Sequence, residues 1–557
     1  MTHLWTITSK IFKMKKLILF ATMLFVLFHT KGHTQIPQLF KDITTIGISG
    51  VPNYQFSHAH AILGDKIYFA GQTANHKLQL WSTDGTVSNT NLVKEINPNG
   101  DAQPSCFFIF NNNLYFGADD GVNGFQLWKS DGTAAGTNLF ATTFAGAVSP
   151  PFPIAIINNK LIFSAIIDSG GSRQLFSTDG TTFQILNPNF AASNQFGDLD
   201  YEYGILNDKM YFSASLTSSI LDSELWVTDG TVAGTYMLKD INSGATFGSA
   251  PQGFCKLNNK LYFTAVTASY GDELWETDGT SGGTILVKDI RTGTAGSGAA
   301  RKFVWNNKLY FNASNVAGPA KMFVSDGTAA GTTIFDANLS IMVGKAFLDK
   351  GSSMVFAAFN ATTGNEWYLT DGTTTTLLTD IYTGTQHGIW DANLSSVINN
   401  KIYFTGNTAA TGPEPWVTDG TVTGTYMLKD IRSGSVGSLT GTKNKFVLFG
   451  SNIYFTASSS NSVGEELWYF NPSVLSTSKV SRDDNFKIYP NPSSGNFNIE
   501  IDENLMGAKA SIYNLLGQKI KDFKLNSTTT NQNLNKGIYL LEIEKDGTKT
   551  SKKLIVN

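Results

Sequence analysis

Short apolar runs separated by turn-forming residues fill most of the chain and repeat in a fixed order. Each repeat holds a loosely apolar run, an Asn-rich turn, a KLYF-like run, a Gly-containing loop, an ELW-like run, an Asp-Gly turn and an LVKDI-like run. The runs are short and show no helical periodicity, so they predict β-strands. An Asp-Gly pair between two apolar runs favours a hairpin, because Gly accepts the positive φ of such turns. Nearly every strand position is apolar, which is typical of sheets covered on both faces.

The repeat has a period of 45 to 50 residues, measured between the Asp residues of successive Asp-Gly-Thr (DGT) triplets. This period is that of propeller blades rather than of helical repeats. An aromatic residue stands three positions before each Asp, and a KLYF-like run ending in Phe occurs nine times. The triplets begin at Asp84, Asp131, Asp179, Asp229, Asp278, Asp326, Asp371 and Asp419, and the aromatic residues are Trp81, Trp128, Phe176, Trp226, Trp275, Phe323, Tyr368 and Trp416, with Trp468 in the ninth repeat.

The two ends of the array predict that it closes on itself. In the ninth repeat Asn471-Pro472 replaces the Asp-Gly pair, and no LVKDI-like run follows. Leu39–Ile43 (LFKDI) is such a run, with no other part of a repeat before it. We therefore predict an all-β fold, a closed β-propeller of about nine four-stranded blades whose N-terminal strand completes the last blade. The alternatives are one repeat that folds irregularly, the seventh being the weakest, or two smaller rings.

The segment Glu273–Thr280 (ELWETDGT) resembles the ELWxxDGT repeat of exported proteins from Bacteroidetes. The resemblance is strong in repeats four, five and nine and partial elsewhere, and the ninth repeat lacks the DGT triplet. It covers residues 35–470 and implies a repeat fold without an activity, so it brings no catalytic residues. Other residues replace the Glu in four repeats: Gln79, Gln126, Gln174 and Lys321.

A different β pattern follows the repeats. Residues 471–484 have the polar composition of a linker. Residues 485–557 alternate short strands with Gly, Pro and Asn turns, which predicts a small β-sandwich. The segments YPNP (489–492), YNLLGQ (513–518) and GIY (537–539) closely resemble the type A C-terminal sorting domain of the type IX secretion system. That resemblance implies the secretion machinery as a partner of residues 485–557, passage through the outer membrane, removal of the domain, and release or attachment to surface lipopolysaccharide.

The first residues predict export as well. Two lysines precede the twelve-residue apolar run Leu17–Phe28, which suits a signal peptide and is shorter than the ~20 residues that span a bilayer. We assign residues 1–34 to this signal, with Met14 as an alternative start, and expect no transmembrane segment in the mature chain. A net charge of −3 and 15% charged residues do not favour nucleic acid or anionic membrane as partners. The predicted location is secreted or attached to the outer-membrane surface.

Cysteine and histidine offer little chemistry. Cys106 and Cys255 lie three repeats apart, and we expect two unpaired thiols buried in strands rather than a disulfide framework. His58 and His60 have the spacing that places both rings on one face of a strand, where they could bind a transition metal. No third ligand is identifiable, so the two histidines are a weak metal candidate that could equally line the central channel.

Carboxylates are the other candidates. The Asp of each DGT triplet is expected to cap its own turn, and the loop residues Asp119, Asp120 and Asp272 are weak calcium candidates. We expect no cofactor. The Glu of the ELW-like run recurs in most repeats, and a periodic residue is better explained by packing or hydrogen bonding within its own blade than by catalysis. This Glu stands at positions 224, 273, 366, 414 and 466.

Function is the least determined property of this sequence. No nucleophile motif, metalloprotease motif or phosphate-binding loop is present, and the aromatic residues of the ELW-like runs are expected in the core before any role in stacking on sugars. We therefore predict a non-enzymatic secreted or surface protein that binds a glycan or a protein. A polysaccharide hydrolase or lyase on the same scaffold and a structural surface component are the alternatives, since fold alone does not decide between them.

Overall fold

The computed structural model describes residues 37–472 and 486–557 apart from short gaps, and these residues form two compact units, one within Gln35–Ser473 and one within Val474–Asn557. The predicted signal peptide and most of the predicted linker lie outside the described residues. The gaps are 42–58, 74–76, 144, 170–172, 191–202, 217–221, 245–246, 343–346, 440–444, 461–463, 503–504, 515–517 and 546–547.

The described part of the first unit contains nine antiparallel sheets, numbered here along the chain. In sheets 1 to 8 the strands follow one another in chain order. Sheets 1 to 5 are β2 (His60–Leu63), β3 (Lys66–Gly71), β4 (Gln79–Thr83), β5 (Asn91–Lys94); β6 (Ser105–Phe110), β7 (Asn113–Asp119), β8 (Phe125–Ser130), β9 (Asn138–Ala141); β10 (Phe152–Ile157), β11 (Lys160–Ile166), β12 (Arg173–Thr178), β13 (Phe183–Ile185); β14 (Tyr203–Leu206), β15 (Lys209–Ala214), β16 (Glu224–Thr228), β17 (Tyr236–Lys239); and β18 (Gln252–Leu257), β19 (Lys260–Thr267), β20 (Gly271–Thr277), β21 (Ile285–Lys288).

The remaining sheets follow the same plan, except that two short strands share the inner edge of sheet 7 and sheet 9 takes its fourth strand from the N-terminal side. The single named helix of the described residues is the short 3-10 helix η2 (Ala392–Leu394). Sheets 6 to 9 are β22 (Ala300–Trp305), β23 (Lys308–Ala313), β24 (Lys321–Ser325), β25 (Thr333–Asp336); β26 (Ser340–Ile341), β27 (Phe347–Asp349), β28 (Met354–Asn360), β29 (Gly364–Thr370), β30 (Thr375–Thr379); β31 (Ser396–Ile398), β32 (Lys401–Thr408), β33 (Gly412–Thr418), β34 (Tyr426–Met427); and β35 (Val447–Phe449), β36 (Asn452–Ala457), β37 (Glu466–Phe470), β1 (Gln38–Lys41).

Strand β1 pairs with β37 as the sequence predicts. Leu39 lies opposite Trp468 and Lys41 opposite Leu467, with a register shift between the two pairs. In sheet 1 the corresponding pairs are Leu92 opposite Trp81 and Lys94 opposite Leu80, also with a register shift between them. Strand β1 is therefore the fourth strand of sheet 9, although it precedes every other strand in the chain.

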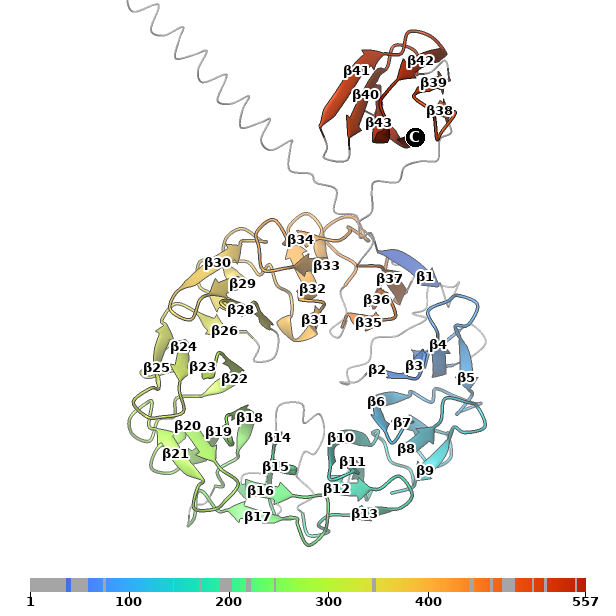
Figure 1. Ribbon diagram of the computed structural model, residues 1–557. Helices are drawn as coiled ribbons and strands as arrows, with labels where there is room; N and C mark the ends of the chain where they lie inside the picture. Colours follow the sequence, from blue (N-terminus) through green and yellow to red (C-terminus); the bar gives the residue numbers. More distant parts are fainter. Residues whose placement is uncertain are drawn as a thin grey trace, which may run out of the picture. The chain divides into compact units, whose positions relative to one another are not determined.

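Nine hydrophobic clusters lie between these sheets in the described residues, and eight of them join sheets that are consecutive in number. The ninth cluster joins sheet 9 to sheet 1: Phe40 and Tyr454 pack with Phe69 and Trp81. Figure 1 shows the sheets following one another around a circle, with the first strand of each on the inner side and the last on the outer side. Most apolar positions of the second and third strands are buried by these contacts, as predicted, whereas several in the first and last strands, such as Ile62, Ile156 and Ile285, are exposed.

The repeated tyrosine and glycine explain why KLYF and DGT recur together. A Cβ atom built on Gly132 of sheet 2 would lie 2.3 Å from the hydroxyl oxygen of Tyr68 in sheet 1. Gly85 of sheet 1 has the same relation to Tyr454 of sheet 9, at 2.8 Å. Both glycines also have positive φ, 96° and 90°, so any side chain there would strain the backbone and collide with the neighbouring sheet.

The repeated lysine of LVKDI links neighbouring sheets from the outer side. The Nζ atom of Lys288 in sheet 5 donates a hydrogen bond to the carbonyl oxygen of Thr332 in sheet 6, at 2.6 Å. Lys429 of sheet 8 donates to the carbonyl oxygen of Pro37, the residue before β1, at 3.0 Å. Strand β1 thus receives the same kind of lysine contact as the outer strand of another sheet.

The second unit is a sandwich of two sheets. One holds β38 (Phe486–Tyr489), β39 (Asn496–Ile501) and β42 (Thr529–Asn533), and the other holds β40 (Lys509–Asn514), β41 (Lys519–Lys524), β43 (Gly537–Lys545) and β44 (Thr548–Val556). Side chains from both sheets share one core, which includes Phe497, Ile499, Ile512 and Leu541. The predicted small β-sandwich is confirmed.

Candidate functional site

The glutamates of the ELW-like runs hold the segment that leads to the next sheet. The carboxylate of Glu273 accepts hydrogen bonds from the backbone amides of Ile290 and Arg291, at 3.0 and 3.1 Å. Glu414 accepts from Ile431 N at 3.1 Å and from Ser438 Oγ at 2.5 Å. Both glutamates are fully buried. Their oxygens are occupied by the protein itself, which fits a structural role rather than general acid–base catalysis.

Glu366 is the exception among these glutamates. Gly388 stands where Ser297 and Ser438 follow the other sheets, eight residues after the Asp of the LVKDI-like run. Glu366 Oε1 accepts from Tyr382 N at 3.2 Å, while Oε2 is buried without a partner among the described residues. Burial, with the nearby Asp380 carboxylate adding to it, raises the pKa of Glu366 to about 8.

The DGT aspartates hold their own turns. Asp131 Oδ1 accepts from the backbone amide and the hydroxyl of Thr133, at 2.9 and 2.8 Å. In Asp179, hydrogen bonds from the Thr182 amide and from Thr181 lower the pKa of the carboxyl group. The same Asp–Thr contact occurs in the turns that begin at Asp84, Asp229, Asp278, Asp326, Asp371 and Asp419. The aromatic residues of the ELW-like runs are buried at Trp81, Trp128, Trp226, Trp275 and Trp468 and partly buried at Trp416.

The metal and calcium candidates do not converge. His58 lies outside the described residues, and His60 begins the inner strand β2. Asp119 Oδ1 accepts from Gly121 N, and Asp120 Oδ1 accepts from the amides two and three residues on, so both cap their own loop. Asp272 lies in sheet 5, three sheets away. No group of three or more His, Cys, Asp or Glu side chains suited to a metal ion occurs in the described parts of the chain.

Cys106 and Cys255 lie on inner strands, β6 and β18, and are not joined in a disulfide; only Cys106 is buried. Cys255 is partly exposed, which corrects the expectation of two buried thiols. Loss of solvent around the thiol raises the pKa of Cys255 to about 11, so Cys255 is not an activated nucleophile. Nearby, Lys302 is buried, and burial lowers its pKa to about 7. The Lys302 Nζ atom donates to Thr264 Oγ1 and to the Ala299 carbonyl oxygen, at 2.6 and 2.7 Å.

A cleft between sheets 7 and 8 is a candidate site. Its cavity volume is about 310 Å³, at the lower end of the roughly 300–1,000 Å³ typical of small-molecule sites. Three segments form it: the connection from β30 to β31, the end of the β32–β33 hairpin, and the segment after β34. They supply, in that order, Tyr382, Gln386 and Trp390; Asn407, Thr408, Ala409 and Pro413; Ser435 and Val436.

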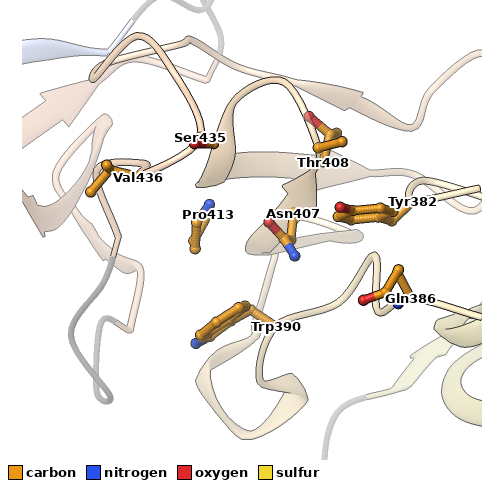
Figure 2. Close-up of a pocket in the computed structure, with 9 residues that line it drawn as sticks. Tyr382, Gln386, Trp390, Asn407, Thr408, Pro413, Ser435 and Val436 are labelled. Carbon is orange, nitrogen blue, oxygen red and sulfur yellow. The ribbon is translucent and has the colours of Figure 1, made fainter.

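Backbone hydrogen bonds fix the aromatic side of this cleft. Trp390 N donates to the carbonyl oxygen of Thr405 at 3.2 Å. Asn407 is tied to the segment that carries Trp390: its backbone amide donates to Gly388 O at 2.8 Å, and its Nδ2 donates to His387 O at 3.2 Å. In the view of Figure 2 the Asn407 amide lies between the rings of Trp390 and Tyr382. The backbone of Trp390 is therefore fixed against β32, and its indole is half exposed (50%).

The cleft was not predicted from the sequence, because its residues are not periodic. Trp390 stands ten residues after the Asp of its LVKDI-like run, where sheet 5 has the buried Ala299. A tryptophan outside the ELW position was the available signal. No helix in the described ranges is both long and apolar enough to cross a membrane.

The sandwich unit carries the sequence match that indicates the export route. Residues 487–557 match the family described as the secretion system C-terminal sorting domain. This match indicates export through the type IX secretion system, with its machinery as a partner of the sandwich unit, and a secreted or cell-surface location. It covers only the end of the chain, and the ELWxxDGT resemblance of the repeats stays a prediction.

Comparison of the whole chain adds little to this. No curated protein matches the sequence. Among solved structures, PorZ, described as a surface component of the type IX secretion system of Porphyromonas gingivalis, aligns at 11% identity over 89% of this chain and 75% of its own, with a TM-score of 0.32. A puromycin-hydrolyzing peptidase of Mycobacterium tuberculosis aligns at 11% identity over 64% of this chain and 57% of its own (TM-score 0.33). The β-propeller domain of the Trilobed protease from Pyrococcus furiosus aligns at 12% identity over 57% and 96% (TM-score 0.29). Scores at this level carry no inference about activity.

Proposed function

We propose that the chain is an exported, non-enzymatic binding protein built on a closed nine-bladed β-propeller. Ring closure is supported by the pairing of β1 with β37 and by the apolar cluster that joins sheet 9 to sheet 1. Export is supported by the match of residues 487–557 to a sorting domain. The propeller is then the part delivered to the medium or the cell surface.

The end of the ring that carries the inter-sheet connections is the proposed binding face. In each four-stranded sheet the Asn-rich turn and the Asp-Gly turn lie at one end of the strands, so the loop between the second and third strands and the connection to the next sheet lie at the other. The repeated residues make the contacts within and between sheets, so a ligand-specific site is better sought among residues that do not recur in each repeat. The observation that carries the proposal is the half-exposed, non-periodic Trp390 at the cleft on this face.

Binding without turnover is favoured by the chemistry of the cleft. None of its nine lining residues is Asp, Glu, His, Lys, Arg or Cys, so it lacks the pair of carboxylates that glycoside hydrolysis usually requires. The ELW glutamates are buried and accept backbone amides. A glycan is the favoured ligand, and a protein is the alternative.

A combined binding and turnover screen tests this function. The chain from residue 35 onward would be applied to glycan and extracellular-protein arrays, and in parallel incubated with polysaccharides while reducing ends and unsaturated products are measured. We expect saturable binding to at least one ligand without product formation. Clear turnover of a polysaccharide would contradict the non-enzymatic assignment, and absence of all binding would contradict the binding assignment.

A further inference from the structure

The cleft between sheets 7 and 8 has features that point to one class of ligand. Trp390 is half exposed, whereas the tryptophans at 81, 128, 226, 275, 305, 367 and 468 are buried and Trp416 is partly buried. A large exposed apolar ring that lies outside the core is typical of a binding surface. The hydrogen bonds of Trp390 and Asn407 fix the two segments that carry these residues before any ligand arrives.

The polar groups of the cleft are all uncharged. Asn407 and Gln386 offer amides, and Tyr382 and Ser435 offer hydroxyl groups. The hydroxyl of Thr408 is bonded to Thr411 of its own loop, at 2.8 Å. The Nδ2 atom of Asn407 donates a hydrogen bond to His387 O. Its Oδ1 atom accepts none from the described residues, so it can accept a hydrogen bond from a ligand hydroxyl. Amides and hydroxyls both donate and accept hydrogen bonds, which suits a ligand that carries many hydroxyl groups.

We propose that this cleft binds neutral pyranose rings of an extracellular glycan, with Trp390 as the stacking surface and Asn407 as the main polar contact. A pyranose ring presents a flat face of C–H groups and an edge of hydroxyl groups, which match an indole ring beside amides. A uronate or sulfated sugar would bring a negative charge into a cleft without a cationic partner, which is unfavourable. This assignment rests on the proposed function and names the ligand class for its site.

Substitutions at Trp390 test the assignment. The probes would be neutral oligosaccharides (cello-, laminari-, xylo-, manno- and chito-oligosaccharides), with polygalacturonate and heparin as acidic glycans and a proline-rich peptide as a competing class. We expect Trp390→Ala to weaken binding of a neutral oligosaccharide at least about tenfold, a loss typical of truncating a central aromatic contact. Trp390→Phe should retain part of the affinity. Intrinsic fluorescence of the wild type should change on titration, and this change should be absent in Trp390→Ala.

Phe247→Ala is the matched control, because Phe247 is another exposed aromatic residue on an inter-sheet connection, between β17 and β18, and it does not line the cleft. It should bind like the wild type, and all variants should melt at the wild-type temperature. If neutral glycans bind Trp390→Ala as tightly as the wild type, the cleft assignment fails while the proposed function stands. If the wild type binds only acidic glycans or the peptide, the ligand class is wrong. If it binds no probe or array ligand at all, the proposed function itself fails.

Discussion

Replacing Glu366 by Gln should stabilise the repeat unit at neutral pH. Glu366 is fully buried, its Oε2 lacks a partner among the described residues, and burial raises its pKa from the usual 4.5 to about 8. The folded state therefore holds the proton more tightly than the unfolded state. Stability from this group is complete below about pH 4.5 and is lost as the pH rises towards 8. At pH 7 the loss is on the order of 3 kcal/mol, since each pKa unit corresponds to about 1.4 kcal/mol.

The chain itself contains the favourable alternative. Gln79 occupies the same position in sheet 1, where its Oε1 accepts from Ile96 N and Asn97 N and its Nε2 donates to the carbonyl oxygens of Asn97 and Gly100. An amide at position 366 can thus satisfy both sides of the pocket without a charge. Its benefit should grow with pH, because only the wild type pays a cost for ionisation.

Thermal unfolding between pH 4.5 and 8.5 measures this effect. The melting temperature of Glu366→Gln should exceed that of the wild type by a margin that widens from pH 5 to 8 and is smallest near pH 4.5. Glu273→Gln is the control, since Glu273 accepts two backbone amides and should show a smaller, flatter difference. A margin for Glu366→Gln that does not change with pH, or a variant less stable than the wild type at pH 8, would refute the reasoning.

Three further predictions concern the core, the closing strand and calcium. Lys302→Met should raise the unfolding free energy near pH 7 by about 2–4 kcal/mol, because the lowered pKa of Lys302 makes the wild type gain stability as the pH rises from about 7 to 10.5. Chemical denaturation at pH 7 and pH 10 should show a smaller gain for the variant at the higher pH. An equal gain at both would contradict this. Phe40 is 7% exposed, so Phe40→Ala should lower the unfolding free energy by about 3–5 kcal/mol. Leu39 is 40% exposed, so Leu39→Ala should lower it by less than about 1 kcal/mol. Similar chemical-denaturation curves for the two variants would argue against β1 as a packed strand. Added calcium should leave the melting temperature unchanged, because the Asp119 and Asp120 carboxylates already accept amides of their own loop, and a clear rise would restore those residues as ligands.

The periodic part of the molecule could be predicted because its contacts recur. The tyrosine of KLYF, the glycine of DGT and the lysine of LVKDI each make one half of a contact between neighbouring sheets, so each has to appear in nearly every repeat. The pairing of β1 with β37 was predictable for the same reason, since LFKDI lacked the rest of its repeat. The second short strand at the inner edge of sheet 7 was not predicted, beyond the weakness of that repeat.

The cleft and the buried charges could not be predicted, because they depend on single departures from the repeat. Trp390 occupies a position where sheet 5 has the buried Ala299, and only the structure places it beside Asn407 of the next sheet. Lys302 lies on β22 between Arg301 and the buried Phe303, and Gly388 lacks the hydroxyl that Glu224 and Glu414 receive from a serine. Each departure is visible in the sequence, but its consequence depends on neighbours contributed by another segment.

Strand β1 also bears on how the protein matures after synthesis. It is made first, yet its partner β37 is made after every other strand of the first unit. Until β37 is present, β1 has no partner for its backbone and Phe40 lacks the neighbours Tyr454 and Leu467. A chain that ended before β37 would therefore leave β1 unpaired, and sheet 9 can be completed only when the whole repeat array has been made.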